Sequence, residues 1–184
     1  MNKKEIRQFY KQKRGELTEQ ERETASLKIY NQVRELFDLT TKNVSIFLPI
    51  QRFQEINTWH FLKELKRTHF FLPVVKGPDL LVHIGYENPN QIEVSQWGIP
   101  EPIYGTEVEP NLFDYVLVPL LAIDKKGYRV GYGKGFYDQF LRQCNANCKF
   151  IGLSYFDPID QIIDLHEADV PLHYCITSSQ VFTF

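Results

Sequence analysis

The spacing of hydrophobic residues changes near residue 40 of the chain. Before that point, apolar residues recur at helical intervals, which predicts a helix over residues 3–14. A second helix is predicted to begin at Thr18, where Glu21 completes a capping box. Its expected apolar stripe contains Ile29, Val33, Leu36 and Phe37. The first part of the chain is therefore predicted to be helical.

Beyond residue 40, apolar residues gather in short runs bounded by turn residues, as in strands. These runs lie at residues 44–48, 70–75, 80–86, 115–123 and 150–155, with helical patterns at 58–65 and 136–143. The runs at 115 and 150 are almost continuously hydrophobic, which indicates strands covered on both faces. The alternation predicts an α/β fold: an open, largely parallel sheet with helices on both faces, in a Rossmann-like three-layer arrangement. We expect one domain over residues 1–184, with the helices of residues 1–37 packed on the α/β core.

Composition narrows the range of functions. The formal charge of −2 disfavours a nucleic-acid partner, because such proteins usually carry a strong basic excess. Three cysteines are too few for a disulfide framework and fit a reducing cytosol. The N-terminus lacks the apolar core of a signal peptide, and the longest apolar run is too short to span a bilayer. We therefore expect a cytoplasmic protein without a membrane partner.

Polar clusters follow three of the predicted strands. They lie at residues 51–55, 124–138 and 157–169. Because ligands of open parallel sheets bind beyond the carboxyl ends of the strands, these clusters are expected to form one site.

The most distinctive cluster contains a glycine loop in which Gly131, Gly133 and Gly135 alternate before a predicted helix. It matches neither the Walker A loop nor the dinucleotide-binding fingerprint. Glycines nevertheless let backbone amides approach an anion, and a helix N-terminus favours phosphate. The pattern therefore predicts a phosphate site, the alternative being a plain surface turn.

Three side chains strengthen the phosphate hypothesis. Lys134 offers a point charge, and Arg129 offers a planar bidentate contact. Asp138 lies about one turn into the predicted helix, where it could bind Mg²⁺ held by phosphates.

The segment VPLLAIDKKGYRVGYGKGFYDQFL, residues 118–141, resembles the signature of 5-formyltetrahydrofolate cyclo-ligases, also called 5,10-methenyltetrahydrofolate synthetases. Further segments resemble the family in the same order: KKEIRQFYKQKR, FLPIQRFQEINT, WGIPEP, IGLSY and EADVPLH. The resemblance covers almost the whole chain. Two positions depart from it, because Gln139 stands where the family often has Arg, and Ala168 where it often has His.

The resemblance implies an ATP- and Mg²⁺-dependent ligase of one-carbon metabolism. ATP would phosphorylate the formyl oxygen of 5-formyltetrahydrofolate, and the folate N10 would then attack the activated carbon. Ring closure would yield 5,10-methenyltetrahydrofolate, ADP and phosphate. No side chain in the sequence stands out as a nucleophile or general base, which agrees with attack by the substrate's own nitrogen.

The resemblance also implies roles for individual residues. Catalysis would involve Arg129 and Lys134, and ATP would be bound by Lys3, Lys4, Arg7, Arg129, Gly131, Gly133, Lys134, Gly135 and Tyr137. The folate would be bound by Ile50, Glu55, Trp97, Tyr132 and Phe136, and Mg²⁺ by Asp138 and Asp169. Lys11 and Arg14, which follow Lys3 and Arg7 at helical spacing, are expected to form a solvated face.

Several alternatives remain open at the level of sequence. Glu55 could be an exposed loop residue, Trp97 could only pack, and Asp124 could either orient the loop or cap a turn. The competing functions are a sugar-phosphate isomerase and a non-catalytic folate- or nucleotide-binding module. A monomer or weak dimer is expected.

Overall fold

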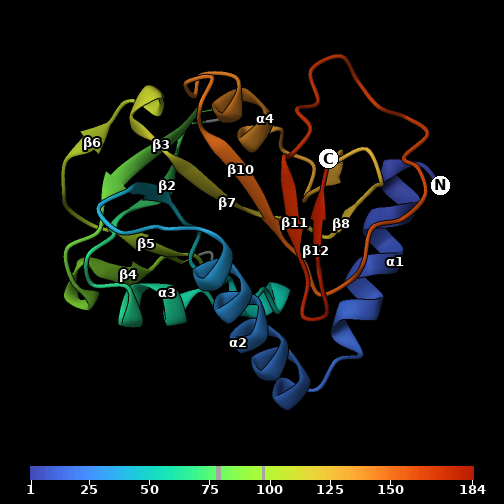
Figure 1. Ribbon diagram of the computed structural model, residues 1–184, viewed down its shortest axis with the longest axis horizontal. Helices are drawn as coiled ribbons and strands as arrows, with labels where there is room; N and C mark the ends of the chain where they lie inside the picture. The colour runs from blue at the N-terminus through green and yellow to red at the C-terminus, as the bar shows by residue number, and fades with distance from the viewer. Residues whose placement is uncertain (78–79, 97) are drawn as a thin grey trace.

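An eight-stranded sheet forms the centre of the computed structural model, which describes residues 1–77, 80–96 and 98–184 (Figure 1). From one edge to the other, the sheet contains β12 (Val181–Thr183), β11 (Tyr174–Ile176), β10 (Lys149–Leu153), β7 (Tyr115–Pro119), β1 (Asn43–Ser45), β2 (His69–Lys76), β3 (Leu80–Gly85) and β6 (Glu107–Val108). The strands from β11 to β2 pair in parallel, whereas β12, β3 and β6 pair antiparallel at the two edges. The predicted largely parallel α/β sheet is confirmed.

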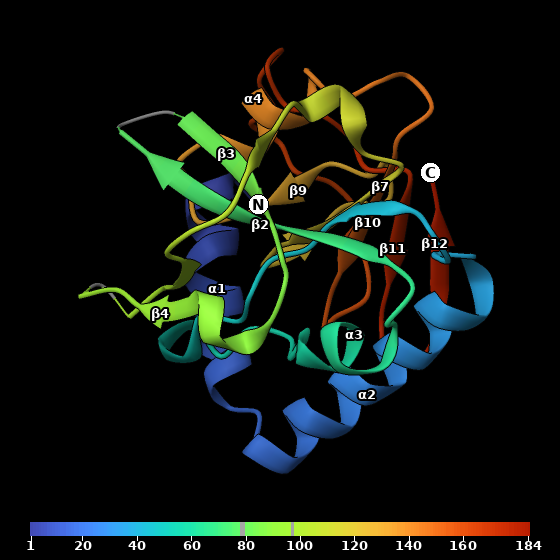
Figure 2. The same ribbon diagram turned by 90° about the vertical axis from the view of Figure 1, so that its left-hand side faces the viewer.

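Each face of the sheet packs against a different set of helices. Leu117 of β7 belongs to a core that includes buried residues of α2 (Glu19–Leu36) and α3 (Trp59–Glu64). Val116 and Val118 belong to a second core with Phe140 of α4 (Phe136–Leu141). This alternation follows from the two-residue period of a strand. Figure 2 shows α2 and α3 on one side of the sheet and α4 on the other.

The chain bends sharply after β7, and this bend divides the predicted strand over residues 115–123. Beyond Leu121, the chain forms β8 (Ala122–Ile123), which pairs antiparallel with β9 (Arg129–Val130) in a separate two-stranded sheet. The Leu121 amide donates to the Val130 carbonyl, so the hairpin provides the hydrogen bonds that a longer β7 would otherwise need. The prediction of one continuous strand is therefore wrong.

The first helix, α1 (Lys3–Gly15), packs on this hairpin. Its buried residues Ile6 and Tyr10 cluster with Leu121, Ala122 and Val130. Asn2 and Glu5 form a capping box that fixes where the helix begins. In Figure 1, α1 accordingly lies beside β8.

Smaller elements were not predicted. They are β4 (Ile92–Val94), β5 (Pro100–Pro102), the 3-10 helices Gln51–Phe53, Pro89–Gln91 and Pro110–Leu112, and the strands β6, β9, β11 and β12. The predicted helix over residues 136–143 ends earlier, at Leu141. No helix in the described part of the chain is both long enough and apolar enough to cross a membrane.

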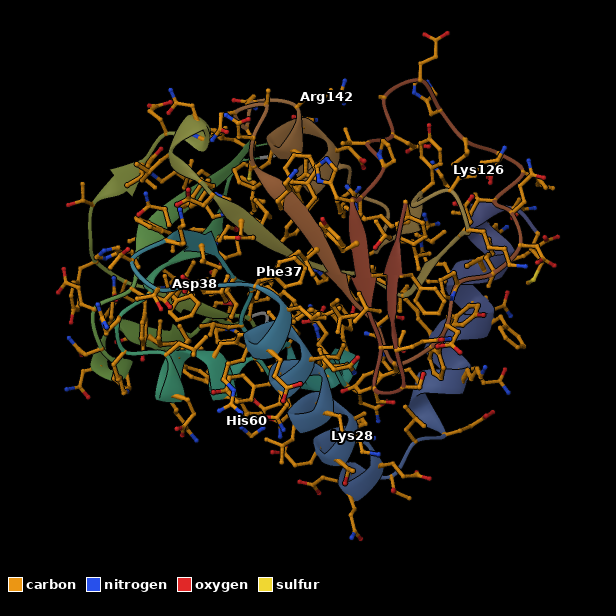
Figure 3. All side chains as sticks on the ribbon, viewed as in Figure 1. Lys28, Phe37, Asp38, His60, Lys126 and Arg142 are labelled. Carbon is orange, nitrogen blue, oxygen red and sulfur yellow. The ribbon has the colours of Figure 1, made fainter. Side chains whose placement is uncertain are left out.

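The predicted apolar stripe of α2 is correct except at its end. Ile29 and Val33 are fully buried, but Leu36 is 56% exposed. Phe37, just beyond the helix, instead packs edge-on against Tyr115 and Tyr174 of the sheet (Figure 3).

We predict that Ile29→Ala lowers the free energy of unfolding by about 2–5 kcal/mol, because it leaves a cavity between α2 and the sheet. Leu36→Ala on the same helix is the matched control, and its free energy should change by less than about 0.5 kcal/mol. Urea denaturation of both variants measures the two values. Equal losses would contradict the described packing of α2.

Candidate active site

The three polar clusters predicted from the sequence lie beyond the C-terminal ends of the parallel strands. Each follows one of three neighbouring parallel strands, β1, β7 and β10. The clusters also contact one another: Phe53 stacks on Tyr132 with ring centroids 4.5 Å apart, and the Ile162 amide donates to Asp124 at 3.2 Å. Parallel pairing thus gathers residues from distant parts of the chain into one region.

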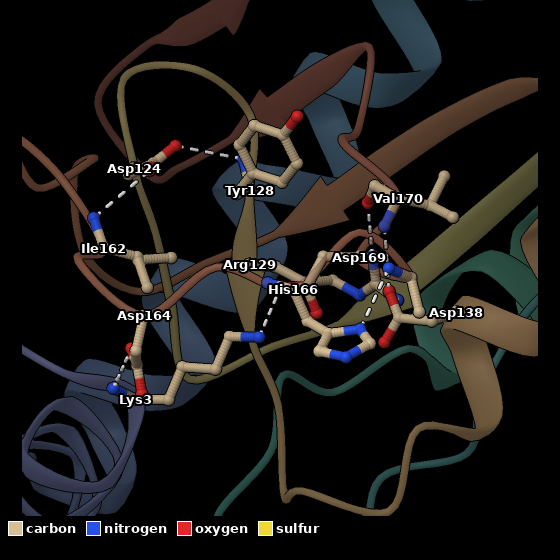
Figure 4. Close-up of polar contacts among 11 residues, drawn as sticks. Lys3, Asp124, Tyr128, Arg129, Asp138, Ile162, Asp164, His166, Asp169 and Val170 are labelled. Atoms are coloured by element: carbon tan, nitrogen blue, oxygen red, sulfur yellow. Dashed lines mark hydrogen bonds and ion pairs between the residues drawn. The ribbon is translucent and has the colours of Figure 1, made fainter.

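Asp124 organises the hairpin that carries the glycine loop. The side chain is fully buried and accepts hydrogen bonds from the amides of Lys126 and Tyr128, which close the β8–β9 turn. It also accepts a hydrogen bond from the Ile162 amide at 3.2 Å, which ties the turn to the segment after β10 (Figure 4). Asp124 therefore caps the turn, and by doing so it holds the hairpin in place.

The glycine loop, residues 131–135, joins β9 to α4. Gly133 and Gly135 have φ angles of 93° and 74°, a left-handed conformation that side chains disfavour. A Cβ atom at Gly133 would lie only 3.2 Å from the Arg7 guanidinium carbon, and Arg7 Nε donates to the Gly131 carbonyl at 2.9 Å. The structure therefore brings Arg7, one of the predicted ATP residues of α1, against the glycine loop.

This loop has the properties of an anion cradle. Its amides donate no hydrogen bond to the part of the chain that the structure describes, and Lys134 at its tip is exposed. Because α4 has only six residues, its dipole contributes little. The loop amides and the cations of Arg7 and Lys134 are the main donors available to a phosphate. Lys4 is exposed on the same helix as Arg7.

Arg129 is buried, with 9% of its surface exposed, and both of its terminal nitrogens donate within the protein. Nη1 donates to the Val170 carbonyl at 2.7 Å, and Nη2 forms an ion pair with Asp138 at 2.8 Å. Burial lowers the pKa of Arg129, and the adjacent Asp138 carboxylate opposes this effect. In the structure, Arg129 therefore orders Asp138.

The two predicted metal ligands, Asp138 and Asp169, lie around this arginine (Figure 4). Asp169 Oδ2 pairs with Lys3 Nζ and accepts the His166 amide. Partial burial raises the pKa of Asp169, but the hydrogen bonds from His166 and Lys3 outweigh this effect and hold the pKa below its ordinary value. Lys3 thus joins the N-terminus of α1 to the same site.

Each of these carboxylates keeps one oxygen that accepts nothing from the described residues, namely Asp138 Oδ2 and Asp169 Oδ1. The described residues contain no group of three or more His, Cys, Asp or Glu side chains arranged for a metal. A pair of carboxylates suits Mg²⁺, which usually keeps several waters and phosphate oxygens as its other ligands. The donor set therefore fits a phosphate-bound magnesium ion.

The Glu55 carboxylate is buried, so the reading of Glu55 as an exposed loop residue is wrong. Oε2 accepts the Ile50 amide at 2.8 Å, and the Tyr132 hydroxyl lies within hydrogen-bonding reach. Burial raises the pKa of Glu55, while these two donors and the charge of Arg14 oppose the rise. Tyr132 in turn stacks on Phe53, with ring centroids 4.5 Å apart.

The remaining predicted folate and nucleotide residues are Tyr137, Ile50, Phe136 and Trp97. The Tyr137 hydroxyl is buried near Glu55 and Arg129, and it has no hydrogen-bond partner among the described residues. Ile50 and Phe136 are half-buried. Trp97 lies outside the described residues.

Arg14 is the residue of this region that the sequence interpretation missed. It was expected on a solvated face, yet only 4% of its surface is exposed. A signal was present, because Arg14 follows the buried Ile6 and Tyr10 at intervals of four and so shares their helix face. Lys11, expected on the same solvated face, is exposed.

We predict that Asp138→Ala lowers the free energy of unfolding of the ligand-free protein by about 3 kcal/mol, because it leaves the buried Arg129 charge unpaired. Asp160→Ala is the matched control. Its ion pair with Lys125 is exposed, so no measurable change is expected. Urea denaturation without ATP or Mg²⁺ tests both, and an unchanged Asp138→Ala variant would contradict the described ion pair.

Comparisons with known proteins assign this chain to a family. Residues 1–178 match the model of the 5-formyltetrahydrofolate cyclo-ligase family. The chain is 29% identical to the 5-formyltetrahydrofolate cyclo-ligase of Mycoplasma genitalium over 178 residues, which covers 90% of this chain and 96% of the relative.

Two solved structures, both described as 5,10-methenyltetrahydrofolate synthetases, share the fold. The protein from Aquifex aeolicus superimposes with a TM-score of 0.85 at 31% identity, covering 100% of this chain and 93% of the other. The protein from Mycoplasma pneumoniae gives 0.78 at 28% identity, covering 97% and 100%. The chain is therefore an enzyme that belongs to the 5-formyltetrahydrofolate cyclo-ligase family.

Proposed function

We propose that this enzyme closes the ring of 5-formyltetrahydrofolate to give 5,10-methenyltetrahydrofolate, using MgATP and releasing ADP and phosphate. One observation supports this above all: the glycine loop lies beside the segment that carries the buried Glu55 carboxylate, because Tyr132 of the loop stacks on Phe53 of that segment with ring centroids 4.5 Å apart. A phosphate cradle next to a buried carboxylate suits transfer from a nucleotide to a polar heterocycle.

The nucleotide phosphates are assigned to the glycine loop and the first turns of α1. The loop amides and the cations of Lys3, Arg7 and Lys134 would hold the phosphate oxygens, with Lys4 at the edge. Gly133 leaves room for Arg7, and a side chain there would displace the guanidinium. Asp138 and Asp169 would hold the Mg²⁺, which neutralises charge on the phosphates when it is bound.

The folate is assigned to the region around Glu55. A carboxylate there can accept the N–H groups of the pterin amidine edge. The Ile50 amide uses only part of the acceptor capacity of its two oxygens. Ile50, Tyr132 and Phe136 would line the pocket, and Trp97 is proposed as a further wall. The unpartnered Tyr137 hydroxyl near Glu55 would gain a partner from the ligand.

The chemistry needs positioning more than a protein nucleophile. Transfer of the γ-phosphoryl group to the formyl oxygen releases ADP and turns that oxygen into part of a leaving group. The N10 lone pair then bonds to the formyl carbon, the carbon–oxygen bond breaks, phosphate leaves, and the N10 proton passes to solvent. Arg129 and Lys134 are assigned to this step, Lys134 by neutralising phosphate charge and Arg129 by ordering Asp138.

The proposal takes residues 1–184 as a single catalytic domain, working in the cytoplasm as a monomer or weak dimer without nucleic-acid or membrane partners. The match to the family over residues 1–178, the formal charge of −2 and the three free thiols support it.

The primary test follows absorbance in the methenyl-folate band with purified protein, 5-formyltetrahydrofolate and MgATP. We expect a rise that disappears when ATP or Mg²⁺ is omitted. ATP binding without any rise would reject the ligase proposal and favour a non-catalytic binding module.

We further predict that Lys134→Ala lowers kcat/KM for ATP by about 100-fold, because it removes a cation from the phosphate cradle. Lys126→Ala is the control, since Lys126 is also an exposed lysine but lies at the tip of the β8–β9 hairpin (Figure 3). Steady-state rates at varied ATP measure both, and similar losses in the two variants would remove Lys134 from the site.

A further inference from the structure

Arg14 is a buried cation that joins three separate segments of the site. Nη1 donates to the Tyr132 hydroxyl at 3.0 Å and to the Phe53 carbonyl at 3.3 Å, and Nη2 donates to the Leu120 carbonyl at 2.5 Å. These partners belong to the glycine loop, the loop after β1 and the bend after β7. The guanidinium also lies over the Tyr155 ring, 5.6 Å from its centroid.

The hydrogen bonds of this arginine have a fixed direction. A guanidinium can only donate, so the Tyr132 oxygen must accept from Arg14. The single hydroxyl hydrogen of Tyr132 is then available for the Glu55 carboxylate within its reach. The Ile50 amide is also a donor to Glu55. The two oxygens of the carboxyl group have enough acceptor capacity for both of these donors.

The charged and titratable groups that face Glu55 come from four elements. They are Arg14 of α1, Tyr132 of the glycine loop, Tyr137 of α4 and Tyr155 after β10. Among these groups, all within the described residues, Arg14 alone is a cation. Burial raises the pKa of Glu55, and the positive charge of Arg14 lowers it. The three neutral phenols carry no charge that could do the same.

We propose that Arg14 is a positioning residue for folate: by binding Phe53, Tyr132 and Leu120 together, it orients Glu55 to accept the N–H edge of the pterin. This role rests on the proposed assignment of Glu55 to folate. It gives three basic residues of α1 different tasks. Lys3 pairs with Asp169 and Arg7 binds the glycine loop, whereas the charge of Arg14 acts on Glu55.

The sign of the pH effect follows from the charge. Loss of Arg14 raises the pKa of Glu55, so the carboxylate becomes protonated at a higher pH than in the wild type. Folate binding should then weaken at a higher pH. We expect the acid limb of kcat/KM for 5-formyltetrahydrofolate to move up by about one pH unit in Arg14→Met. At the pH optimum, kcat and the KM for ATP should stay close to the wild-type values.

Three further variants distinguish an effect of the Arg14 charge from a general loss of structure. Lys13→Met removes one positive charge from an adjacent exposed position of α1 and should leave the acid limb in place. Arg14→Lys keeps the charge and should restore most of the wild-type profile. Tyr132→Phe breaks the link to Glu55 but keeps the bonds from Arg14 to Phe53 and Leu120, so it should move the acid limb upward even if Arg14→Met does not fold.

A second measurement does not depend on activity. Titration of the Glu55 side-chain carboxyl carbon by NMR in the ligand-free protein should give a higher pKa in Arg14→Met and Tyr132→Phe than in the wild type and Lys13→Met. An unchanged Glu55 titration would overturn the role of Arg14, as would equal losses of kcat/KM at every pH. A shifted Glu55 titration in a protein that forms no methenyl-folate would instead support the electrostatic link and reject the proposed function.

Discussion

The parallel pairing of β7 with β1 and β10 is the constraint on which the site depends. In this arrangement the C-terminal ends of the three strands point the same way, so the loops that follow them meet although they are far apart in the sequence. Antiparallel pairing of any one strand would send its loop to the opposite edge. The hydrophobic residues that cover both faces of β7 therefore do more than stabilise the core, because they fix which polar segments become neighbours.

Two buried arginines organise the polar edge in different ways. Arg129 pairs with a carboxylate, Asp138, and so lies next to its counter-charge. Arg14 donates to two carbonyls and a hydroxyl, and its charge acts on Glu55 across a tyrosine. Both arrangements bury groups that water would solvate better, so they reduce the stability of the free protein. The proposed recognition of a charged nucleotide and a polar heterocycle carries this cost, which the two hydrophobic cores offset.

Local patterns predicted much of this architecture. The strands over residues 70–75 and 80–86 and the start of α2 at Thr18 agree closely with the structure, because short apolar runs and capping boxes act over a few residues. The bend after β7 was not predicted, because it depends on hydrogen bonds with Arg14 and Val130, which lie elsewhere in the chain. Arg14 itself was misplaced because a basic residue on a helix is usually solvated. The phosphate role of the glycine loop was predicted from its own glycines and charged side chains, whereas the role of Asp169 came from resemblance alone, because no periodicity indicates it.

The position of α1 has a consequence for how the protein is made on the ribosome. Lys3 contacts Asp169, 166 residues further along, and Arg7 and Arg14 contact residues more than 100 positions downstream. At about 5–20 residues per second, the first helix therefore waits roughly 10–30 s for its docking surface to be synthesised. During translation it has to persist as an undocked amphipathic segment, whose capping box favours helix but whose apolar face is uncovered. The proposed nucleotide end of the site is thus the last part of the nascent enzyme to assemble, although the residues that α1 contributes to it are the first to be translated.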